Sequence, residues 1–219
     1  MIRTVLFDLD GTILDTNELI FRSFEYAWTQ KGWTHVTREQ LTPYMGGKLT
    51  DMFRLVTGAG EAEVEELIRL YREYNWAHHD ELVCSFPYVR ETMEELRRAG
   101  VRMGVVTTKI RKTSEMGLKH CGLEQFIETI VSLDDVVHAK PHPEPVLKAL
   151  SLMKADPATT IMVGDSKADL LAARDAGVRS VAVGWTIKRR DELEACRPDY
   201  WIEDMRELPA LVGATEESV

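Results

Sequence analysis

Two acidic residues stand two positions apart near the start of the chain, in the segment Asp8-Leu9-Asp10-Gly11-Thr12. In extended backbone this spacing places both carboxylates on one face, and a tight turn at Gly11 would hold them close together. Carboxylates so close repel each other. A hard divalent cation such as Mg²⁺ relieves the repulsion while it also binds phosphate oxygens and water. The segment therefore predicts a metal-assisted reaction on a phosphorylated substrate.

Residue types suited to binding phosphate or a metal ion recur at three later points in the chain. Thr107–Lys109 and Gly164–Asp169 each follow a short apolar run, and Lys140 with its following proline stands just after another. The carboxyl ends of parallel strands share one edge of a sheet, so we expect these segments to meet. Helix caps and turns would explain any one of them alone. Their joint occurrence favours a reactive site.

The residue types predict nucleophilic catalysis. With Lys140 and the metal offsetting charge repulsion, we expect Asp8 to attack phosphorus and form an aspartyl-phosphate intermediate. Asp10 would protonate the leaving oxygen and then take a proton from the attacking water. Thr107 would hold nonbridging phosphoryl oxygens through its hydroxyl and backbone N–H. Asp165 would supply a further oxygen to the metal from the opposite strand end.

The elements that must position these groups have the rhythm of an α/β protein. Short apolar, β-branched runs predict buried strands at Thr4–Phe7, Arg102–Val106, Thr129–Leu133, Thr160–Val163, Ser180–Val183 and Tyr200–Ile202. Amphipathic stretches between them predict crossover helices over Arg90–Ala99, Lys112–His120, Pro143–Met153 and Ala168–Ala176. Strands that alternate with helices favour parallel βαβ units. We therefore expect a Rossmann-like, doubly wound parallel sheet.

An inserted helical segment interrupts this rhythm. Between about Asp15 and Asp80 the pattern has helical periodicity and no convincing strand. We therefore expect an α/β core of residues 1–14 and 82–219 and a helical cap of residues 15–81. An insertion directly after the first strand would lie over the carboxyl ends of the strands, where it could close as a lid.

Several residues around these motifs are candidates for substrate contact. In the cap, Gly47 and Lys48 combine a backbone turn with a cation, although a solvated lysine at a helix start is the alternative interpretation. In the core, we expect contacts from the residues that neighbour the catalytic motifs, namely Gly11, Thr12, Thr108 and Lys109.

Composition excludes several classes of protein. The 219 residues are 44% hydrophobic and 29% charged, which is enough apolar material for a core, and the net charge is −9. This negative charge repels phosphate backbones and anionic lipids, so we expect neither nucleic acid nor a membrane surface as a partner. The apolar runs are too short for a membrane span, and Asp8 and Asp10 interrupt any secretory leader. We expect a cytoplasmic protein, and the oligomeric state stays open.

Three histidines carry open interpretations. His78 and His79 are adjacent, and adjacent helical residues point in different directions, so ordinary hydrogen bonds are favoured over a shared metal ion. His142 stands close to Lys140, where it is either a local turn residue or a neighbour of the site.

Taken in order, the four motifs resemble those of the haloacid dehalogenase superfamily, and the resemblance covers nearly the whole chain. Its Asp-x-Asp pattern is similar to the superfamily's phosphatases and phosphomutases rather than to its dehalogenases, and the helical insertion resembles a C1-type cap. The resemblance implies that Mg²⁺ is bound by Asp8, the Asp10 carbonyl and Asp165, with Asp169 supporting the metal shell. It also implies that the phosphoryl group is bound by Thr107 and Lys140.

Additional stretches resemble the bacterial PpaX-type inorganic pyrophosphatases, namely Asn75–Asp80, Thr107–Arg111, Leu133–Pro141 and Trp185–Lys188. Close relatives tend to carry proline in the cap loop, where this chain has Met45–Leu49. The resemblance implies inorganic pyrophosphate as the leading substrate. Three alternatives stay open: a phosphatase for phosphoglycolate or another small phosphomonoester, a β-phosphoglucomutase-like phosphomutase, and a noncatalytic protein that binds metal or phosphate.

Overall fold

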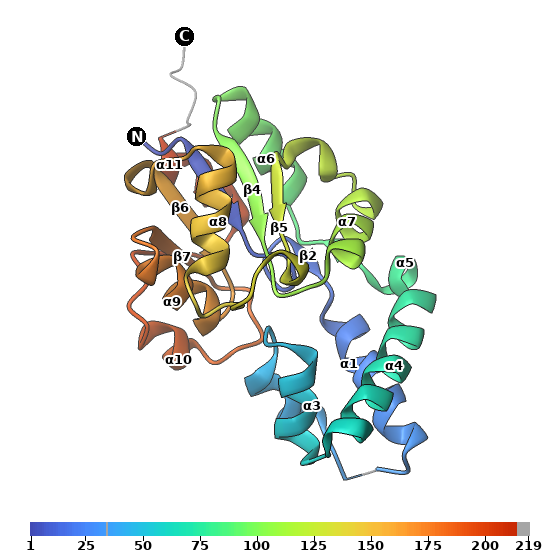
Figure 1. Cartoon of the computed structure of the whole chain (residues 1–219). Helices are drawn as coiled ribbons and strands as arrows, with labels where there is room; N and C mark the ends of the chain where they lie inside the picture. Colours follow the sequence, from blue (N-terminus) through green and yellow to red (C-terminus); the bar gives the residue numbers. More distant parts are fainter. Residues whose placement is uncertain (34, 214–219) are drawn as a thin grey trace.

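A six-stranded parallel sheet forms the centre of the molecule in the computed structural model, which describes residues 1–33 and 35–213 (Figure 1). Its strand order is β5-β4-β1-β6-β7-β8, and every neighbouring pair is parallel. The strands are β1 (Thr4–Phe7), β4 (Arg102–Val106), β5 (Thr129–Val131), β6 (Thr160–Gly164), β7 (Arg179–Val183) and β8 (Tyr200–Ile202). Phe7 at the end of β1 pairs with Val105 and Val163. The register therefore brings the ends of β1, β4 and β6 to one level.

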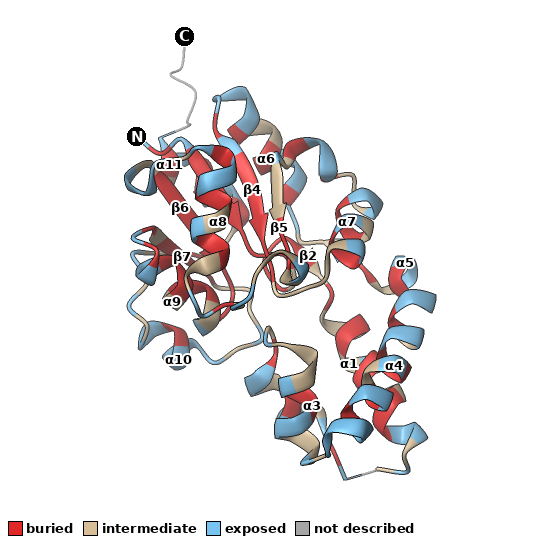
Figure 2. Cartoon of the chain, viewed as in Figure 1, coloured by how far each residue is buried: buried red, intermediate tan, exposed pale blue. Residues whose placement is uncertain are grey.

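Helices cover both faces of the sheet, as a doubly wound fold requires. Alternate residues of β1 point to opposite faces: Val5 and Phe7 join one apolar cluster, and Leu6 joins another. The first cluster includes side chains of α6 (Val89–Arg98), α7 (Arg111–His120) and α11 (Leu208–Val212), and the second those of α8 (Glu144–Met153) and α9 (Lys167–Asp175). The strands β1, β4, β6 and β7 are largely buried, the edge strands β5 and β8 are less so, and the outer helix faces are exposed (Figure 2). The predicted α/β class is confirmed.

Shorter helical elements connect the strands of the core. They are α10 (Arg190–Glu194) and the 3-10 turns η2 (Glu124–Phe126), η3 (Leu133–Asp135), η4 (Pro157–Thr159) and η5 (Met205–Glu207). Over the described residues, no helix has both the length and the apolar character needed to cross a membrane.

A second group of helices lies beyond the carboxyl edge of the sheet (Figure 1). It comprises α1 (Asn17–Gln30), α2 (Arg38–Leu41), η1 (Thr42–Tyr44), α3 (Leu49–Thr57), α4 (Glu61–Ala77) and α5 (His79–Leu82). Helices α1 to α4 share an apolar cluster of their own, whereas Leu82 of α5 packs against the apolar cluster of the sheet. The Phe24 ring lies 4.4 Å from that of Phe53 and 5.0 Å from that of Tyr71, measured between ring centroids. The group therefore has a core separate from that of the sheet.

One strand prediction needs correction, and one pair of strands was not predicted. β5 ends at Val131 rather than Leu133, because the Asp135 carboxylate accepts hydrogen bonds from Ser132 N and Oγ and turns the chain into η3. The chain also enters and leaves the helical group through an unexpected antiparallel pair, β2 (Leu14–Asp15) and β3 (Cys84–Ser85). Strands of two residues are too short to give the alternating pattern from which a strand is predicted.

Candidate active site

The ends of three neighbouring strands bring the predicted catalytic side chains together. Asp8 follows β1, and its backbone N–H donates to the Val163 carbonyl at 2.9 Å. Thr107 follows β4 and donates in the same way to the Val131 carbonyl at 2.9 Å. Both side chains are buried, and Asp165 is buried at the end of β6. These hydrogen bonds continue the sheet one residue past the end of β1 and β4, so the backbone fixes the positions of the Asp8 and Thr107 Cα atoms.

Lys140 reaches this edge from the loop before α8. Its ammonium donates to Asp8 Oδ1 at 2.6 Å, to Asp169 Oδ1 at 2.5 Å and to the Val106 carbonyl at 2.7 Å. Burial favours the neutral amine, but the carboxylates of Asp169 and Asp8 outweigh this effect and raise the pKa of Lys140. The ammonium therefore stays charged and holds one oxygen of Asp8 in place.

Asp169 is fully engaged by its neighbours. Its Oδ1 accepts the hydrogen bond from Lys140, and its Oδ2 accepts hydrogen bonds from Ser166 N at 3.0 Å and Ser166 Oγ at 2.6 Å. The Asp169 N–H in turn donates to Ser166 Oγ at 3.4 Å, which together with the hydrogen bond from Ser166 N forms a capping box at the start of α9. In this arrangement Asp169 orients Lys140 from the first turn of the helix.

The three buried carboxylates form a cluster suited to a cation. Asp8, Asp165 and Asp169 each offer an oxygen within 4.8 Å of the others. Burial and the charge of Asp169 raise the pKa of Asp8 to about 8, with Asp165 adding to the effect and Lys140 opposing it. Asp165 Oδ1 is buried and accepts no hydrogen bond from the described residues. An orphaned oxygen among crowded carboxylates fits a bound hard cation, which would satisfy the oxygen and offset the charge.

Gly11 and Thr12 lie behind this cluster rather than on the walls of the cavity described below. Gly11 has a φ of 85°, and a Cβ there would lie 2.4 Å from Asp165 Oδ2. Glycine is therefore required so that the β1 loop can approach β6. Thr12 is buried, and its carbonyl accepts a hydrogen bond from Trp185 Nε1 at 3.2 Å. The structure does not bring these two residues to the substrate side.

The Asp10 carboxylate points away from the acidic cluster. Its Oδ1 accepts hydrogen bonds from Thr16 Oγ1 at 2.8 Å and from Lys109 Nζ at 2.9 Å, and its Oδ2 lies 3.2 Å from the same ammonium. Thr16 directly precedes α1, so this contact joins the acid to the helical group. The Asp10 carboxylate is therefore held by Thr16 and Lys109 and is not one of the three clustered carboxylates described above.

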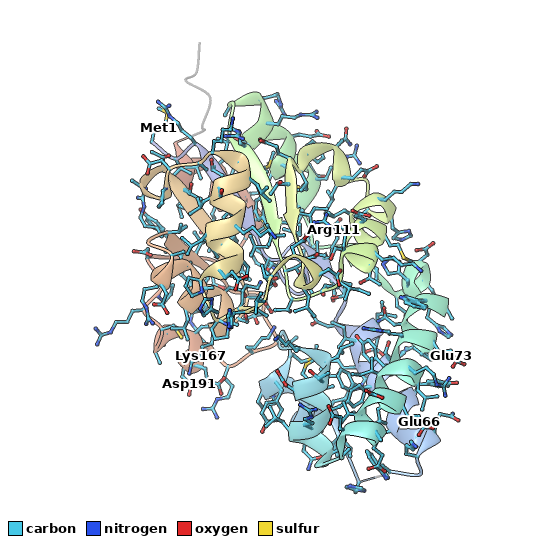
Figure 3. The ribbon with its side chains drawn as sticks, in the orientation of Figure 1. Met1, Glu66, Glu73, Arg111, Lys167 and Asp191 are labelled. Carbon is cyan, nitrogen blue, oxygen red and sulfur yellow. The ribbon has the colours of Figure 1, made fainter. Side chains whose placement is uncertain are left out.

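A cavity of about 170 Å³ lies between the helical group and the edge of the sheet. The core contributes Asp8, Asp10, Thr107, Thr108 and Lys109, and the helical group contributes Gly47, Lys48 and Arg72 among others. Thr108 Oγ1 also donates to the Gly46 carbonyl at 2.8 Å, which ties the two parts together. The side chains that fill the space between these parts are shown in Figure 3. The predicted positions of Gly47 and Lys48 at the site agree with this cavity.

Two cations that border the cavity were missed by the sequence predictions. Lys188 donates to the buried Asp165 Oδ2 and lines the cavity. Its place five residues after β7 is a signal that the strand-end rule could have used. Arg72 lies on α4 between Tyr71 and Glu73, and helical periodicity does not show which charged side chain of this helix lines the cavity. By contrast, Arg111, labelled in Figure 3, binds Asp135 at 2.6 Å and does not line the cavity.

The two histidines at the junction of α4 and α5 are held by local contacts. His78 Nδ1 lies 3.0 Å from the Tyr74 carbonyl, and the His78 ring stacks on the Tyr74 ring. His79 is buried, with Nδ1 2.7 Å from Asp80 Oδ1. The two rings thus have separate partners.

The sequence relatives of this chain are hydrolases. The family model for haloacid dehalogenase-like hydrolases matches residues 5–183. The chain is 47% identical over 207 residues to the pyrophosphatase PpaX of Bacillus mycoides, which covers 94% of this chain and 95% of that protein. It is 46% identical over 217 residues to the pyrophosphatase PpaX of Bacillus cereus, which covers 99% of each.

Solved structures share the fold over nearly the whole length. A haloacid dehalogenase-like hydrolase from Bacteroides fragilis superposes with a TM-score of 0.90 at 27% identity, over 95% of this chain and 100% of the other. A predicted phosphoglycolate phosphatase from Haemophilus somnus has a TM-score of 0.89 at 21% identity, over 96% and 97% of the two chains, and shows the fold alone. By its family match, its relatives and its fold, the chain belongs to the haloacid dehalogenase-like hydrolases.

Proposed function

We propose that this hydrolase is a Mg²⁺-dependent phosphohydrolase that cleaves inorganic pyrophosphate through an aspartyl-phosphate intermediate. The observation that carries the proposal is the charge pattern of the cavity. Asp8, held by Lys140, lies in its wall together with Lys48, Arg72 and Lys109. A substrate that is anionic at both ends matches such a site. The names of the full-length relatives at 46–47% identity support the same substrate.

In this mechanism Asp8 is the nucleophile. Lys140 holds Oδ1, which leaves Oδ2 to attack phosphorus. The new bond joins Asp8 Oδ2 to one phosphorus, and the bond from that phosphorus to the bridging oxygen breaks. The second phosphate leaves, and water then attacks the aspartyl-phosphate to release the first phosphate and restore Asp8. Thr107, buried beside Asp8, would hold nonbridging oxygens in both steps.

Asp10 would serve as acid and base. It protonates the bridging oxygen as that oxygen leaves, and it takes a proton from the attacking water in the second step. The contacts from Thr16 and Lys109 hold its carboxylate at the cavity wall before substrate arrives. Lys109 would then pair with the departing phosphate, so its ammonium would contact both the proton donor Asp10 and the leaving group that receives the proton.

The residues that would hold Mg²⁺ are Asp8, Asp165 and the backbone carbonyl of Asp10. Asp169 would support them through Lys140 and Ser166. When bound, the cation offsets the negative charge that accumulates between the nucleophile and the phosphoryl oxygens. The orphaned Asp165 Oδ1 and the raised pKa of Asp8 support this assignment.

We also propose that residues 15–81 act as a cap over a core of residues 1–14 and 82–219. The separate apolar cluster of the helical group and the paired strands β2 and β3 at the two chain crossings support these boundaries. Closure of the cap would exclude water and bring Gly47, Lys48 and Arg72 to the substrate.

One observation favours a second candidate, a small phosphomonoester such as phosphoglycolate. The cap side of the cavity also carries apolar side chains, namely Ile20, Met45, Met52 and Ile68. Apolar walls suit an organic leaving group better than a second phosphate. The two candidates therefore differ in which part of the cap wall contacts the leaving group.

Phosphate release from a substrate panel separates these candidates. The panel contains pyrophosphate, phosphoglycolate, phosphosugars and nucleotides, each with and without Mg²⁺. We expect the highest kcat/KM for pyrophosphate, a dependence on Mg²⁺, and loss of turnover in Asp8→Asn. A dominant phosphomonoester would overturn the substrate assignment, and full activity of Asp8→Asn would overturn the mechanism. Transfer of the phosphoryl group to a sugar without phosphate release would indicate a phosphomutase, and tight binding without any turnover would indicate a binding protein.

A matched pair of variants on α4 tests the cap contact. Arg72→Gln removes a cation from the cavity wall, whereas Arg69→Gln removes an exposed arginine that pairs with Glu73 one turn along the same helix. We expect Arg72→Gln to raise KM for pyrophosphate by roughly tenfold, because an interaction with an ionised group contributes about 1.5–3 kcal/mol. Arg69→Gln should leave KM unchanged. Equal KM values for both variants would exclude Arg72 from the substrate site.

A further inference from the structure

An exposed group of nitrogen and oxygen ligands lies outside the cavity, in the loop between η3 and α8. His138, His142 and Glu144 each offer one ligand atom, and these atoms all lie within 4.8 Å of one another. A backbone hydrogen bond from His142 N to the Ala139 carbonyl at 3.0 Å closes the turn between the histidines. The turn sets the two imidazole centroids 4.6 Å apart. The group is thus organised by the backbone rather than by chance approach of long side chains.

The existing contacts keep Glu144 charged and aimed at His138. Its Oε1 accepts from Val137 N at 2.8 Å, and its Oε2 accepts from His138 N at 2.9 Å. These backbone hydrogen bonds, with the His138 side chain, lower the pKa of Glu144 to about 2. His138 Nδ1 lies 2.9 Å from Oε2, and the Glu144 N–H donates to His142 Nδ1 at 3.1 Å. The carboxylate is therefore ionised at neutral pH and already shared with one of the rings.

We propose that His138, His142 and Glu144 bind a transition-metal dication of the Zn²⁺, Ni²⁺ or Co²⁺ class. Imidazole nitrogen with one carboxylate is a ligand set that these ions prefer, whereas Mg²⁺ prefers oxygen ligands alone. The site is distinct from the buried carboxylate cluster in both ligand chemistry and exposure.

The spacing of the ligand atoms is close to what such an ion needs. With bonds of about 2.0–2.1 Å in a tetrahedral arrangement, ligand atoms lie roughly 3.3 Å apart. Here His138 Nδ1 lies 2.9 Å from Glu144 Oε2, and the three ligand atoms all lie within 4.8 Å of one another. Small rotations of exposed side chains bridge this difference. The ion would replace the hydrogen bonds that now join the rings to Glu144, and the fourth position would be left to water.

The position of the site links it to the catalytic centre. Lys140 lies between the two histidines in sequence, and its ammonium contacts both Asp8 and Asp169. His138 and His142 also border a groove between core and cap that includes Asp51 and Asp175. An ion bound to both histidines would fix the loop that presents Lys140 to the nucleophile.

Calorimetric titration with Zn²⁺ tests the proposal on the full chain in excess Mg²⁺. The variants are His138→Ala/His142→Ala and, as a matched control, His35→Ala, which removes an exposed histidine of the cap. We expect wild type and the control to bind one more equivalent of Zn²⁺ than the double variant, with micromolar affinity. Equal stoichiometry and affinity in all three proteins would overturn the proposal.

A second measurement covers the case in which the double variant folds poorly. In wild type, one equivalent of Co²⁺ should broaden the ring proton resonances of His138 and His142 but not that of His35. Glu144→Gln keeps an acceptor for one of the two loop N–H groups but removes the charge, and we expect it to weaken Zn²⁺ binding at least tenfold. No selective broadening, or unchanged affinity in Glu144→Gln, would rule the site out.

Discussion

Replacement of Asp8 by asparagine should abolish turnover and yet stabilise the protein in the absence of metal. The Asp8 carboxyl is buried beside Asp169 and Asp165, and these surroundings raise its pKa from 3.8 to about 8. The folded state therefore holds the Asp8 proton more tightly than the unfolded state does. Above pH 3.8 the unfolded chain ionises freely, whereas the folded chain either keeps a proton or buries an extra charge. This cost grows with pH and is complete above about pH 8, and Asp8→Asn removes it.

The size of the effect follows from the same pKa values. The interval between 3.8 and about 8 is roughly 4 pH units, and each is worth about 1.4 kcal/mol, which sets an upper bound of about 6 kcal/mol. Local relaxation, with an effective dielectric constant near 20, reduces this value. Loss of the hydrogen bond between Lys140 and the carboxylate offsets a further part. We expect a net gain of about 1–3 kcal/mol, or about 2–10 °C in Tm for a chain of this length.

Thermal unfolding in chelator at pH 8 and pH 5 measures this difference. At pH 8 the variant should melt above wild type, and at pH 5 the gap should shrink to about a third, because folded wild type then holds the proton. Saturating Mg²⁺ should close or reverse this difference in Tm, because the bound ion offsets the carboxylate charge in wild type, whereas the variant lacks one of the ligands for the ion. The exposed control Asp175→Asn should change stability by less than about 0.5 kcal/mol. Equal or lower Tm for Asp8→Asn in chelator at pH 8 would refute the reasoning.

Three further substitutions test individual contacts of the site. Gly11→Ala should lower the free energy of unfolding by at least about 2 kcal/mol and weaken Mg²⁺-dependent turnover, because its Cβ would collide with Asp165. The control Gly177→Ala has a similar φ but open space around the Cβ, and it should lower the free energy of unfolding by about 1 kcal/mol in the same chemical denaturation assay. Lys109→Met should lower kcat for pyrophosphate roughly 10- to 100-fold and alter the pH–rate profile, since the proposed acid–base carboxylate loses its cation; an unchanged profile would contradict this role. Thr108→Val should raise KM several-fold with little change in kcat, because it removes a hydrogen bond to the cap loop, and steady-state kinetics would show the opposite pattern if the contact acted on chemistry.

The sequence carried enough information to predict the core of the fold. Buried parallel strands are continuous apolar runs, and β1, β4 and β8 have the predicted bounds. The strand-end rule then placed Asp8, Thr107 and Asp165 at one edge, since the strands of a parallel sheet all run in the same direction and their carboxyl ends share one edge. Helical periodicity likewise predicted the group of helices between β2 and β3. These features depend on local pattern and on general rules of chain connection.

The tertiary structure alone decided how the polar side chains pair. Asp10 and Asp169 belong to motifs found from sequence, but their partners Lys109 and Lys140 lie 99 and 29 residues away. Which oxygen faces which cation depends on side-chain rotamers and on how the helical group packs against the sheet, and hydrophobic periodicity predicts neither. Arg72 shows the same limit, because the packing of α4 against α1 and α3 decides which of its charged side chains lines the cavity. Sequence thus determined the scaffold and the kinds of chemical groups at its edge, whereas long-range packing determined the charge network that makes those groups a site.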